Sequence, residues 1–472
     1  MSAEELAQAL EVRNLGPFLA LLGSMEADGD IVLTRKHRYG IPERMGLVVG
    51  CLQGHPRGYA FLIPDDAARE DVFVPRSGLN GAMHRDRVIV RINRSAALAG
   101  GQAEGEVIRI LKRGSQRLVG TFERVRQHGF VAPDDQRIGT DILIPRGAAA
   151  GAKPHDKVVV EITAWPSARR GPEGRVVEVL GREGEPGVDV LSIIKQHDLP
   201  LEFPAAVLAE AKKVPQEVTA FDRHGRRDLR DLLMVTIDGE DAKDLDDAVS
   251  LVPEKGNTYQ LGVHIADVSY YVREGSRLDA EAFRRGTSVY LVDRVIPMLP
   301  PQLSNGICSL NAGVDRLALS VLMRVSYRGR VLDYEIVPSV IHVHKRLTYN
   351  LVRQLIEEKD RELRQEHREL VPMLERMGRL ATALRQKRLA GGAIDFDLPE
   401  AKVILDERGR PKEVVRAVRS LADQIIEEFM ILANETVARH LEANGLPGVY
   451  RVHEDPDPEK ISNLNKFLGP LG

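Results

Sequence analysis

The sequence predicts a multidomain α+β protein in which small β-barrels precede a larger domain of mixed strands and helices. Three observations support this fold class. A repeat of about 70 residues fills much of the first half of the 472-residue chain. After Asp228 the pattern changes to strand-like segments followed by long helical stretches. Within that second half, an acidic run lies between two strand-like segments, Asp231–Ile237 and Leu261–Val268.

Composition limits the class of protein. With 43% hydrophobic residues, the chain can form real cores, and its length suits about three domains. The net charge of −3 neither supports nor excludes nucleic acid, although basic residues gather in Arg109–Arg126. The two cysteines, Cys51 and Cys308, are too few for a disulfide framework and fit a reducing cytosol. No apolar run approaches the ~20 residues of a membrane span, so we expect a cytoplasmic protein without a membrane partner.

Residues 1–48 are predicted to be the remnant of a winged helix–turn–helix. A helical stretch, Leu15–Met25, is followed by Asp30–Ile41, whose basic residues resemble a wing between two short strands. This part could dock a partner or contact RNA, and it could equally be a structural cap.

The repeat predicts two five-stranded barrels of the OB-fold type. In the first copy, Gly58–Asp66 and Asp71–Pro75 correspond to Gly129–Asp135 and Asp141–Pro145 of the second. Short alternating strands with Gly, Pro and Asp at the turns suit such a barrel. The predicted boundaries are 49–113 and 114–182, followed by a linker at 183–227.

Both copies resemble the cold-shock type of OB-fold, whose exposed aromatic side chains stack on single-stranded bases. Tyr59, Phe61 and Phe73 would form this platform in the first copy. The second copy has Phe130 but carries Leu143 where the first has Phe73, so its surface should bind more weakly, at ~1–3 kcal/mol per stacked base. The alternative is that these aromatic residues form the barrel core.

Residues 228–472 are predicted to form the mixed α/β domain. Helices are expected at 350–388, broken near Pro372, and at 413–444. The motifs of phosphate-binding loops, serine hydrolases and zinc proteases do not occur in the sequence. His342 and His344 are interpreted as surface residues. Strands are expected at 232–237, 247–252, 259–268, 288–292, 317–325 and 331–343.

The acidic run predicts a divalent metal site. Its six carboxylates within ten residues are Asp238, Glu240, Asp241, Asp244, Asp246 and Asp247. Two like charges ~5 Å apart repel by about 3 kcal/mol at an effective dielectric of ~20, so a cation is needed. Ligand sets made only of oxygen favour Mg²⁺, Mn²⁺ or Ca²⁺. A calcium loop of the EF-hand type would need glycine where this run has Lys243. The alternative is a solvated acidic turn.

Four stretches resemble the catalytic domain of the ribonuclease II (RNB) family. They are Thr236–Val249 (TIDGEDAKDLDDAV), Gly262–Val272, Ser288–Asn311 and Gly391–Glu400. The resemblance implies a processive 3′–5′ exoribonuclease that releases nucleoside 5′-monophosphates with Mg²⁺, with Mn²⁺ as the alternative metal. Such an enzyme would turn over and process single-stranded and structured RNA with a 3′ overhang, and would act as a monomer.

The same resemblance assigns site residues. Asp238 and Asp247 would be direct Mg²⁺ ligands, Asp244 would support a metal or its waters, and Asp246 would be the most sensitive catalytic carboxylate. Glu240 and Asp241 fall outside this set.

Four further residues would bind the RNA. Tyr290 and Phe396 match the aromatic pair that clamps the last bases, and Tyr349 and Glu427 match residues that read the ribose. Glu427 would lie with Arg416 on a polar stripe of the predicted helix 413–444, which could equally face solvent.

The sequence also departs from the family pattern. We find neither the family's arginine-containing segment nor the third, S1-type barrel, and expect an incomplete catalytic domain. Residues 1–472 are therefore expected to bind single-stranded RNA weakly and to cleave it slowly or not at all. An alternative hypothesis is a non-catalytic RNA-binding relative that acts through its cold-shock copies.

Overall fold

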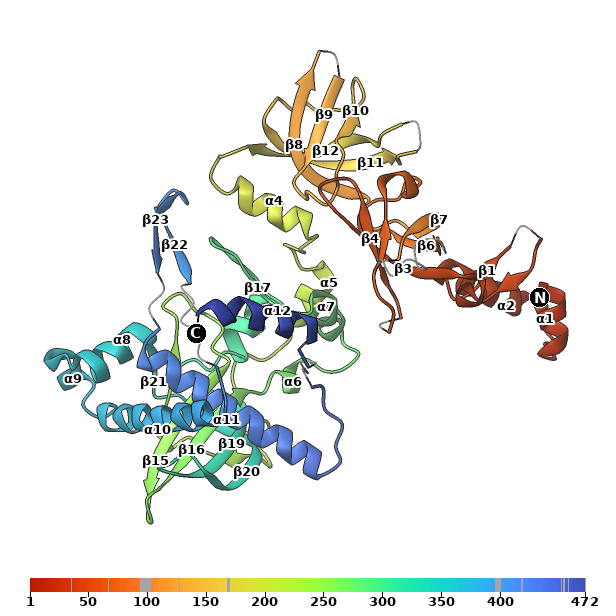
Figure 1. Ribbon diagram of the computed structural model, residues 1–472. Coiled ribbons are helices and arrows are strands. Elements are labelled where there is room, and N and C mark those ends of the chain that lie inside the picture. Colours follow the sequence, from red (N-terminus) through yellow and green to blue (C-terminus); the bar gives the residue numbers. More distant parts are fainter. Residues whose placement is uncertain are drawn as a thin grey trace. The chain divides into compact units, whose positions relative to one another are not determined.

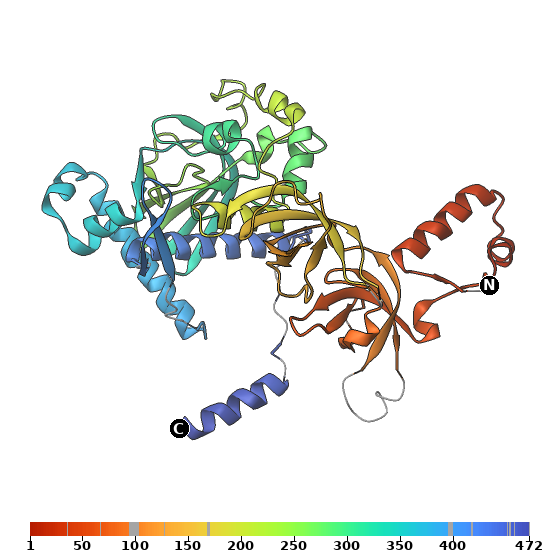
Figure 2. The same cartoon turned by 90° about the horizontal axis from the view of Figure 1, so that it is seen from above.

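The fold is described from a computed structural model, in which the chain divides into two compact units (Figures 1 and 2). The first unit holds Met1–Leu201, Tyr290–Ile296 and Val403–Val414, and the second holds the remainder. Each unit is described by itself. The structure describes residues 1–34, 36–66, 68–93, 103–126, 128–167, 170–394, 400–416, 419–450, 452, 455–456 and 458–471.

The N-terminal part consists of two helices and a small hairpin. Helix α1 (Ala3–Ala9) begins with a capping box between Ser2 and Glu5, and α2 (Leu15–Asp28) ends at Gly29, whose φ of 86° suits glycine. Strands β1 (Val32–Leu33) and β2 (Tyr39–Gly40) pair antiparallel. The predicted helix and hairpin are therefore present, whereas α1 was not predicted. The winged-helix assignment stays a prediction.

The first repeat copy forms a five-stranded sheet in the order β5-β4-β3-β6-β7. A parallel bridge between Phe73 and Glu104 joins its two edges. Alternate residues face an apolar core that includes Leu52, Leu62 and Val88. The strands are β3 (Leu47–Gly54), β4 (Ala60–Pro64), β5 (Val72–Val74), β6 (Arg87–Ile92) and β7 (Gly105–Lys112).

The second copy forms a closed barrel in the order β10-β12-β11-β8-β9. Phe122, Ile142 and Val160 lie in its core. The segment that was predicted to be a linker, 183–227, instead contains helices. Its helix α4 (Val188–Gln196) packs against β8, β11 and β12. The barrel strands are β8 (Arg117–Val125), β9 (His128–Pro133), β10 (Ile142–Ile144), β11 (Asp156–Ala164) and β12 (Glu173–Arg182).

The second unit is built on a seven-stranded sheet in the order β13-β20-β19-β16-β15-β14-β21. Neighbouring strands are antiparallel except for two parallel pairs, β13 with β20 and β14 with β21. The strands are β13 (Arg227–Asp228), β14 (Met234–Asp238), β15 (Asp247–Glu254), β16 (Thr258–Ala266), β19 (Asp315–Ser326), β20 (Val331–His342) and β21 (Lys345–Thr348).

Long helices cover one face of this sheet (Figure 1). Apolar residues of α10 (Val371–Ala390) and α11 (Leu421–Ala443) share a core with β14, β15, β16 and β19. The predicted helix 350–388 is broken as expected, into α8 (Tyr349–Arg353), a π-helical turn, α9 (Arg361–Glu366) and α10. The predicted helix 413–444 is wrong at its start, because Pro411–Arg416 forms strand β23.

Shorter elements complete the chain. Helices α5 (Ala205–Ala211) and α7 (Arg277–Arg285) share a smaller core with the π-helical turn Gln302–Ile307. The other elements are α6 (Val268–Tyr271), β17 (Val289–Tyr290), β18 (Val295–Ile296), β22 (Ala401–Leu405) and α12 (Pro458–Leu468). Within the described residues, none of the helices combines the length and the apolar composition needed to cross a bilayer.

Candidate active site and nucleic-acid interface

The four predicted aspartates lie at one edge of the seven-stranded sheet. Asp238 is the last residue of β14, and Asp247 is the first residue of β15, which pairs antiparallel with β14. The end of one strand therefore lies beside the start of the next. Asp244 and Asp246 belong to the connection between them, residues 239–246, which we call the acidic loop.

Burial alternates along the acidic loop. Leu245 is 2% exposed and packs in an apolar cluster, whereas the adjacent Asp244 is half-buried and Asp246 is exposed. The buried leucine thus anchors the loop, while the two aspartates on either side of it remain accessible. Glu240 and Asp241 are exposed, as Asp246 is, and their place outside the site stays a prediction.

Burial and mutual repulsion of the carboxylates raise the pKa values of three of the four aspartates. Burial, together with the carboxylate of Asp247, raises the pKa of Asp238 to about 7. Burial and Asp246 raise the pKa of Asp247 to about 6, and burial and Asp244 raise the pKa of Asp246. These dependences show that the four carboxylates lie close enough to interact.

Asp238 has the least satisfied carboxylate. Its Oδ2 atom is buried and has no hydrogen-bond partner. The Arg346 guanidinium lowers the pKa of Asp238, but its Nη2 atom donates to the carbonyl oxygens of Gly239 (3.1 Å) and Glu240 (2.9 Å). Arg346 therefore holds the start of the acidic loop and offsets only part of the effect that raises the pKa of Asp238.

These residues fit a divalent cation. All the donors are carboxylate oxygens, which suit Mg²⁺ or Mn²⁺, and a buried oxygen atom lacks a partner. Among the residues that the structure describes, no group of three or more His, Cys, Asp or Glu side chains is arranged so that it could hold a metal ion, so the fit rests on the chemistry of the donors. His342 contacts an aspartate outside this site: its Nδ1 atom lies 3.1 Å from Asp315 Oδ1.

Tyr349 lies beside the aspartates. It is the first residue of α8 and directly follows Thr348, which pairs with Asp238 across β14 and β21. Burial raises the pKa of Tyr349 to about 12, with further contributions from Asp238, Asp247 and Asp423. Its predicted place near the reacting end of an RNA is consistent with this position.

Glu427 lies on α11 in a cluster of charges. Its carboxylate pairs with Arg388, at 3.4 Å, and with Arg419. The expectation that Glu427 shares a helical stripe with Arg416 is wrong, because Arg416 belongs to β23 and α11 begins only at Leu421.

The predicted base clamp is only partly described. Tyr290 is 64% exposed on β17, which pairs with β18. It belongs to the first compact unit and the aspartates to the second, so each is described separately. Phe396 lies outside the described residues, and the clamp stays a prediction.

The aromatic residues of the first barrel lie outside its core. Phe61 and Phe73 are cross-strand partners on β4 and β5, and both point away from the buried residues that flank them. Tyr59 packs against both rings, at centroid distances of 5.7 Å and 5.3 Å, and stacks on His55 at 4.2 Å. The core alternative is therefore wrong for these three rings. In the second barrel, half-buried Phe130 pairs with Leu143.

A cleft of about 870 Å³ opens beside these rings, between the two barrels of the first unit. His55, Tyr59, Arg76, Arg137 and Arg170 are among its lining residues. The three arginines could not be predicted from the sequence, because they come from separate turns and form no local motif. Aromatic and cationic side chains on one surface are typical of single-strand binding sites.

Comparison with known proteins identifies the family of the chain. Residues 226–470 match the RNB domain, and the chain belongs to this family. Residues 50–110 match the ribonuclease B OB domain, and residues 130–204 match the cold shock domain. The predicted fold class, OB-fold barrels followed by a mixed α/β RNB domain, is confirmed.

The similar relatives within the family are ribonucleases R. The chain is 47% identical to ribonuclease R of Thermotoga maritima over 95% of this chain and 62% of the relative. It is 40% identical to that of Vibrio cholerae and to that of Escherichia coli, over 100% of this chain and 58% of each relative. The chain thus spans about three fifths of the length of these relatives.

Solved structures show the same fold. Mycoplasma genitalium RNase R in complex with ribose methylated single-stranded RNA has a TM-score of 0.81 and 27% identity, over 90% of this chain and 66% of that chain. Its complex with double-stranded RNA has a TM-score of 0.72 over 83% of this chain and 66% of that chain. Yeast Ssd1, a pseudonuclease, shares the fold at 19% identity, with a TM-score of 0.69 over 91% of this chain and 59% of that chain.

Proposed function

We propose that this chain acts as a Mg²⁺-dependent 3′–5′ exoribonuclease that processively releases nucleoside 5′-monophosphates, with Mn²⁺ as a possible substitute. The observation that carries the proposal is the cluster of four aspartates at one sheet edge, where Asp238 Oδ2 is buried without a partner. The ribonucleases R among its relatives support the same reaction.

The proposed roles of the aspartates differ with their positions in the site. Asp238 and Asp247, at the ends of paired strands, would hold the cation on a rigid frame. Asp244, on the acidic loop, would orient a metal or its waters. When bound, Mg²⁺ supplies activation of a water molecule and neutralises charge on the attacked phosphate.

Asp246 is suited to proton transfer because it is the most accessible of the four aspartates. The water oxygen bonds to phosphorus while its proton passes to an Asp246 carboxylate oxygen. The bond from phosphorus to the 3′-oxygen of the preceding nucleotide breaks, and this oxygen takes a proton from solvent. The released nucleotide keeps a 5′-phosphate.

The other predicted residues would hold RNA of any sequence. Tyr349 and Glu427 would contact the terminal ribose, whose 2′-hydroxyl distinguishes RNA from DNA. Tyr290 and Phe396 would stack on the last bases. The rings around Tyr59 and the adjacent cleft would bind the single-stranded part farther from the 3′ end. We propose single-stranded RNA, and structured RNA with a 3′ overhang, as substrates of a monomeric enzyme.

The test is single-turnover decay of a 5′-labelled oligo(A) by the full chain with Mg²⁺. We expect slow shortening of the labelled RNA from its 3′ end, which a chelator abolishes. Asp246→Asn should slow cleavage by about 100- to 1000-fold while RNA affinity is unchanged. Asp241→Asn is the matched control, because Asp241 is exposed on the same loop. Asp246→Asn activity within a few-fold of the parent would refute the assignment.

The same assay decides between an enzyme and a non-catalytic relative. A protein that binds the oligonucleotide normally but releases no mononucleotide at any Mg²⁺ concentration would be an RNA-binding relative. The fold alone does not decide, because the pseudonuclease Ssd1 shares it.

A further inference from the structure

Residues 306–310, which we call the bracing segment, lie far from the acidic loop in sequence but hold it through hydrogen bonds, which we call the brace. The hydroxyl of Ser309 accepts a hydrogen bond from Leu245 N at 3.0 Å and donates to Lys243 O at 3.1 Å. Leu310 N donates to Leu245 O at 2.8 Å. Because these partners lie more than 60 residues apart in sequence, the brace is a tertiary contact and not a turn within the loop.

These contacts fall on alternate residues of the loop. Lys243 and Leu245 are the neighbours of Asp244, so a single hydroxyl fixes the backbone on both sides of this aspartate. Leu245 also precedes Asp246, whose carbonyl oxygen accepts from Ala266 N at 2.9 Å. The backbone is held at these points while the carboxylates of Asp244 and Asp246 remain accessible.

Ser309 is well placed for this role because its contacts are shielded from water. The residue is fully buried. Among the described residues, its hydroxyl has one further hydrogen-bond partner, Asn311 Oδ1, at 3.4 Å. A buried hydrogen bond cannot be replaced by water when one partner is removed. Loss of the hydroxyl would leave Leu245 N and Lys243 O unpaired next to the site.

Arg316, at the start of β19, holds Ser309 in turn. Its Nε atom donates to Ser309 O at 2.8 Å, and its Nη2 atom donates to Gly306 O at 3.2 Å. Its Nη1 atom donates to Asp315 O at 2.9 Å. The planar guanidinium therefore fixes two points of the bracing segment and one point of the strand.

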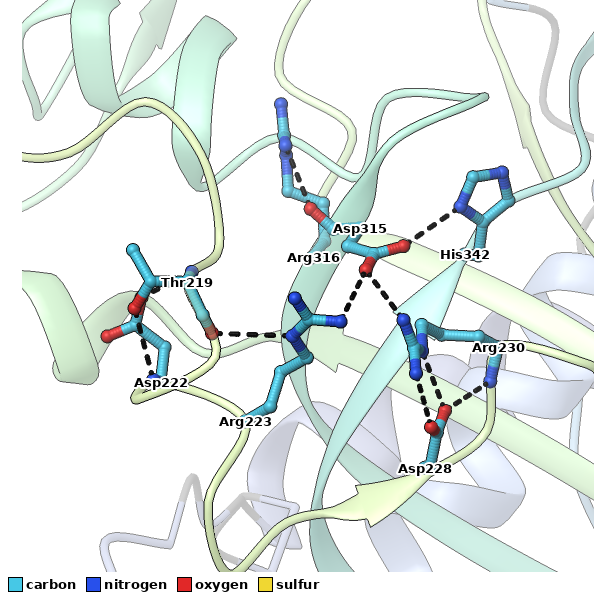
Figure 3. Close-up of polar contacts among 8 residues, drawn as sticks. All are labelled: Thr219, Asp222, Arg223, Asp228, Arg230, Asp315, Arg316 and His342. Carbon is cyan, nitrogen blue, oxygen red and sulfur yellow. Dashed lines mark hydrogen bonds and ion pairs between the residues drawn. The ribbon is translucent and has the colours of Figure 1, made fainter.

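The start of β19 is itself fixed by a charge cluster (Figure 3). The Asp315 carboxylate pairs with Arg230 (3.1 Å), Arg223 (3.7 Å) and His342 (3.1 Å). Figure 3 shows the Arg316 side chain extending away from this cluster. Two successive residues thus make different contacts. Asp315 forms ion pairs with neighbouring residues, and Arg316 donates hydrogen bonds to the bracing segment.

We propose that Ser309 is a positioning residue for the metal-binding carboxylates, and that Arg316 fixes Ser309 in place. This inference rests on the proposed function, since it assigns the brace to the same site. The four negative charges repel one another, and a loop held only at its ends would move so that the charges separate. Fixing Lys243 and Leu245 keeps Asp244 and Asp246 at the separation that a cation needs.

The test is the Mg²⁺ dependence of cleavage by Ser309→Ala in the full chain. We expect the Mg²⁺ concentration for half-maximal rate to rise about tenfold or more, as for other residues that orient metal ligands, with the rate largely restored at saturating Mg²⁺. Ser320→Ala is the matched control. Its hydroxyl is also fully buried in this sheet, but it contacts His264 and Ser339, at 2.6 Å each, and not the loop.

The outcomes separate positioning from general stability. Ser320→Ala should lower the melting temperature as Ser309→Ala does, without changing the Mg²⁺ midpoint. A midpoint for Ser309→Ala within twofold of the parent, or equally shifted midpoints in both variants, would overturn the inference. If Ser309→Ala does not fold, Arg316→Lys, which keeps the charge but loses the fork, should shift the midpoint in the same direction, and an unshifted midpoint would overturn it.

Direct metal titration distinguishes this inference from the proposed function. With Mn²⁺ followed by calorimetry, a parent that binds no metal refutes the metal site itself. If the parent binds metal and Ser309→Ala binds it equally well, the result refutes only the positioning role of Ser309.

Discussion

Asp238→Asn should stabilise the metal-free protein at pH 8. The folded state raises the pKa of Asp238 from 3.8 to about 7. At 1.36 kcal/mol for each pKa unit this corresponds to about 4 kcal/mol for a fully buried group. Asp238 is only half-buried, and solvent screening reduces the effect to about 1–2 kcal/mol. Asparagine carries no charge and avoids this cost.

The pH dependence has a defined sign. A carboxyl group with a raised pKa leaves folding unaffected below about pH 4, where it is protonated in both states. The cost of ionising it grows as the pH rises and is complete above about pH 7. The stabilisation by Asp238→Asn should therefore be largest at pH 8, fall to about a third at pH 5, and disappear in more acid solution.

With Mg²⁺ bound, the parent should become more stable to unfolding than Asp238→Asn. A ligand at 100 times its dissociation constant stabilises the folded state by about 2.7 kcal/mol, and the parent should gain more of this than Asp238→Asn. The assay is scanning calorimetry at pH 5 and pH 8, with Mg²⁺ or with chelator. A shift of a few degrees is expected, with Asp241→Asn unchanged. The reasoning is refuted if Asp238→Asn melts no higher than the parent at pH 8 in chelator.

Two further predictions concern RNA. Tyr59→Ala removes the ring that packs on Phe61, Phe73 and His55, and should weaken single-stranded RNA binding by about 1–3 kcal/mol without changing the salt dependence, as followed by fluorescence anisotropy; unchanged affinity would show that RNA does not use this surface. Tyr290→Ala and Phe396→Ala should each release longer end products and shorten processive runs on a labelled oligo(A), and an unaltered product ladder would remove both rings from the clamp.

Much of the site could be predicted because its signal is local. A strand, an acidic run and a second strand place Asp238 and Asp247 at adjacent strand ends whatever the rest of the chain does. The alternation in β4 and β5 likewise fixes the repeat as a barrel, although alternation alone does not say that Phe61 and Phe73 face outward. Their outward position follows from the apolar residues that flank each of them along the strand, Ala60, Leu62, Val72 and Val74, which fill the core.

Other features depend on contacts between distant residues. Residues 413–416 are predicted to begin a helix, but they belong to β23 (Pro411–Arg416), which pairs with Ala401–Leu405 in a hairpin. The positioning role of Ser309 and Arg316 could not be read from the sequence, although Ser309 lies in the stretch Ser288–Asn311, because it depends on backbone groups more than 60 residues away or on carbonyls of a turn. Such partners are fixed only when the sheet assembles.

Metal binding by the aspartates is the central claim, and a calorimetric titration of Mg²⁺ or Mn²⁺ into the full chain tests it most directly. The account predicts saturable binding that tightens from about pH 6 to about pH 8, because the cation displaces the proton from Asp238, whose pKa is about 7. Asp238→Asn and Asp247→Asn should each weaken it about tenfold or more, and Asp241→Asn should leave it unchanged. Absent binding in the parent, or equal affinity in Asp238→Asn, would contradict the account.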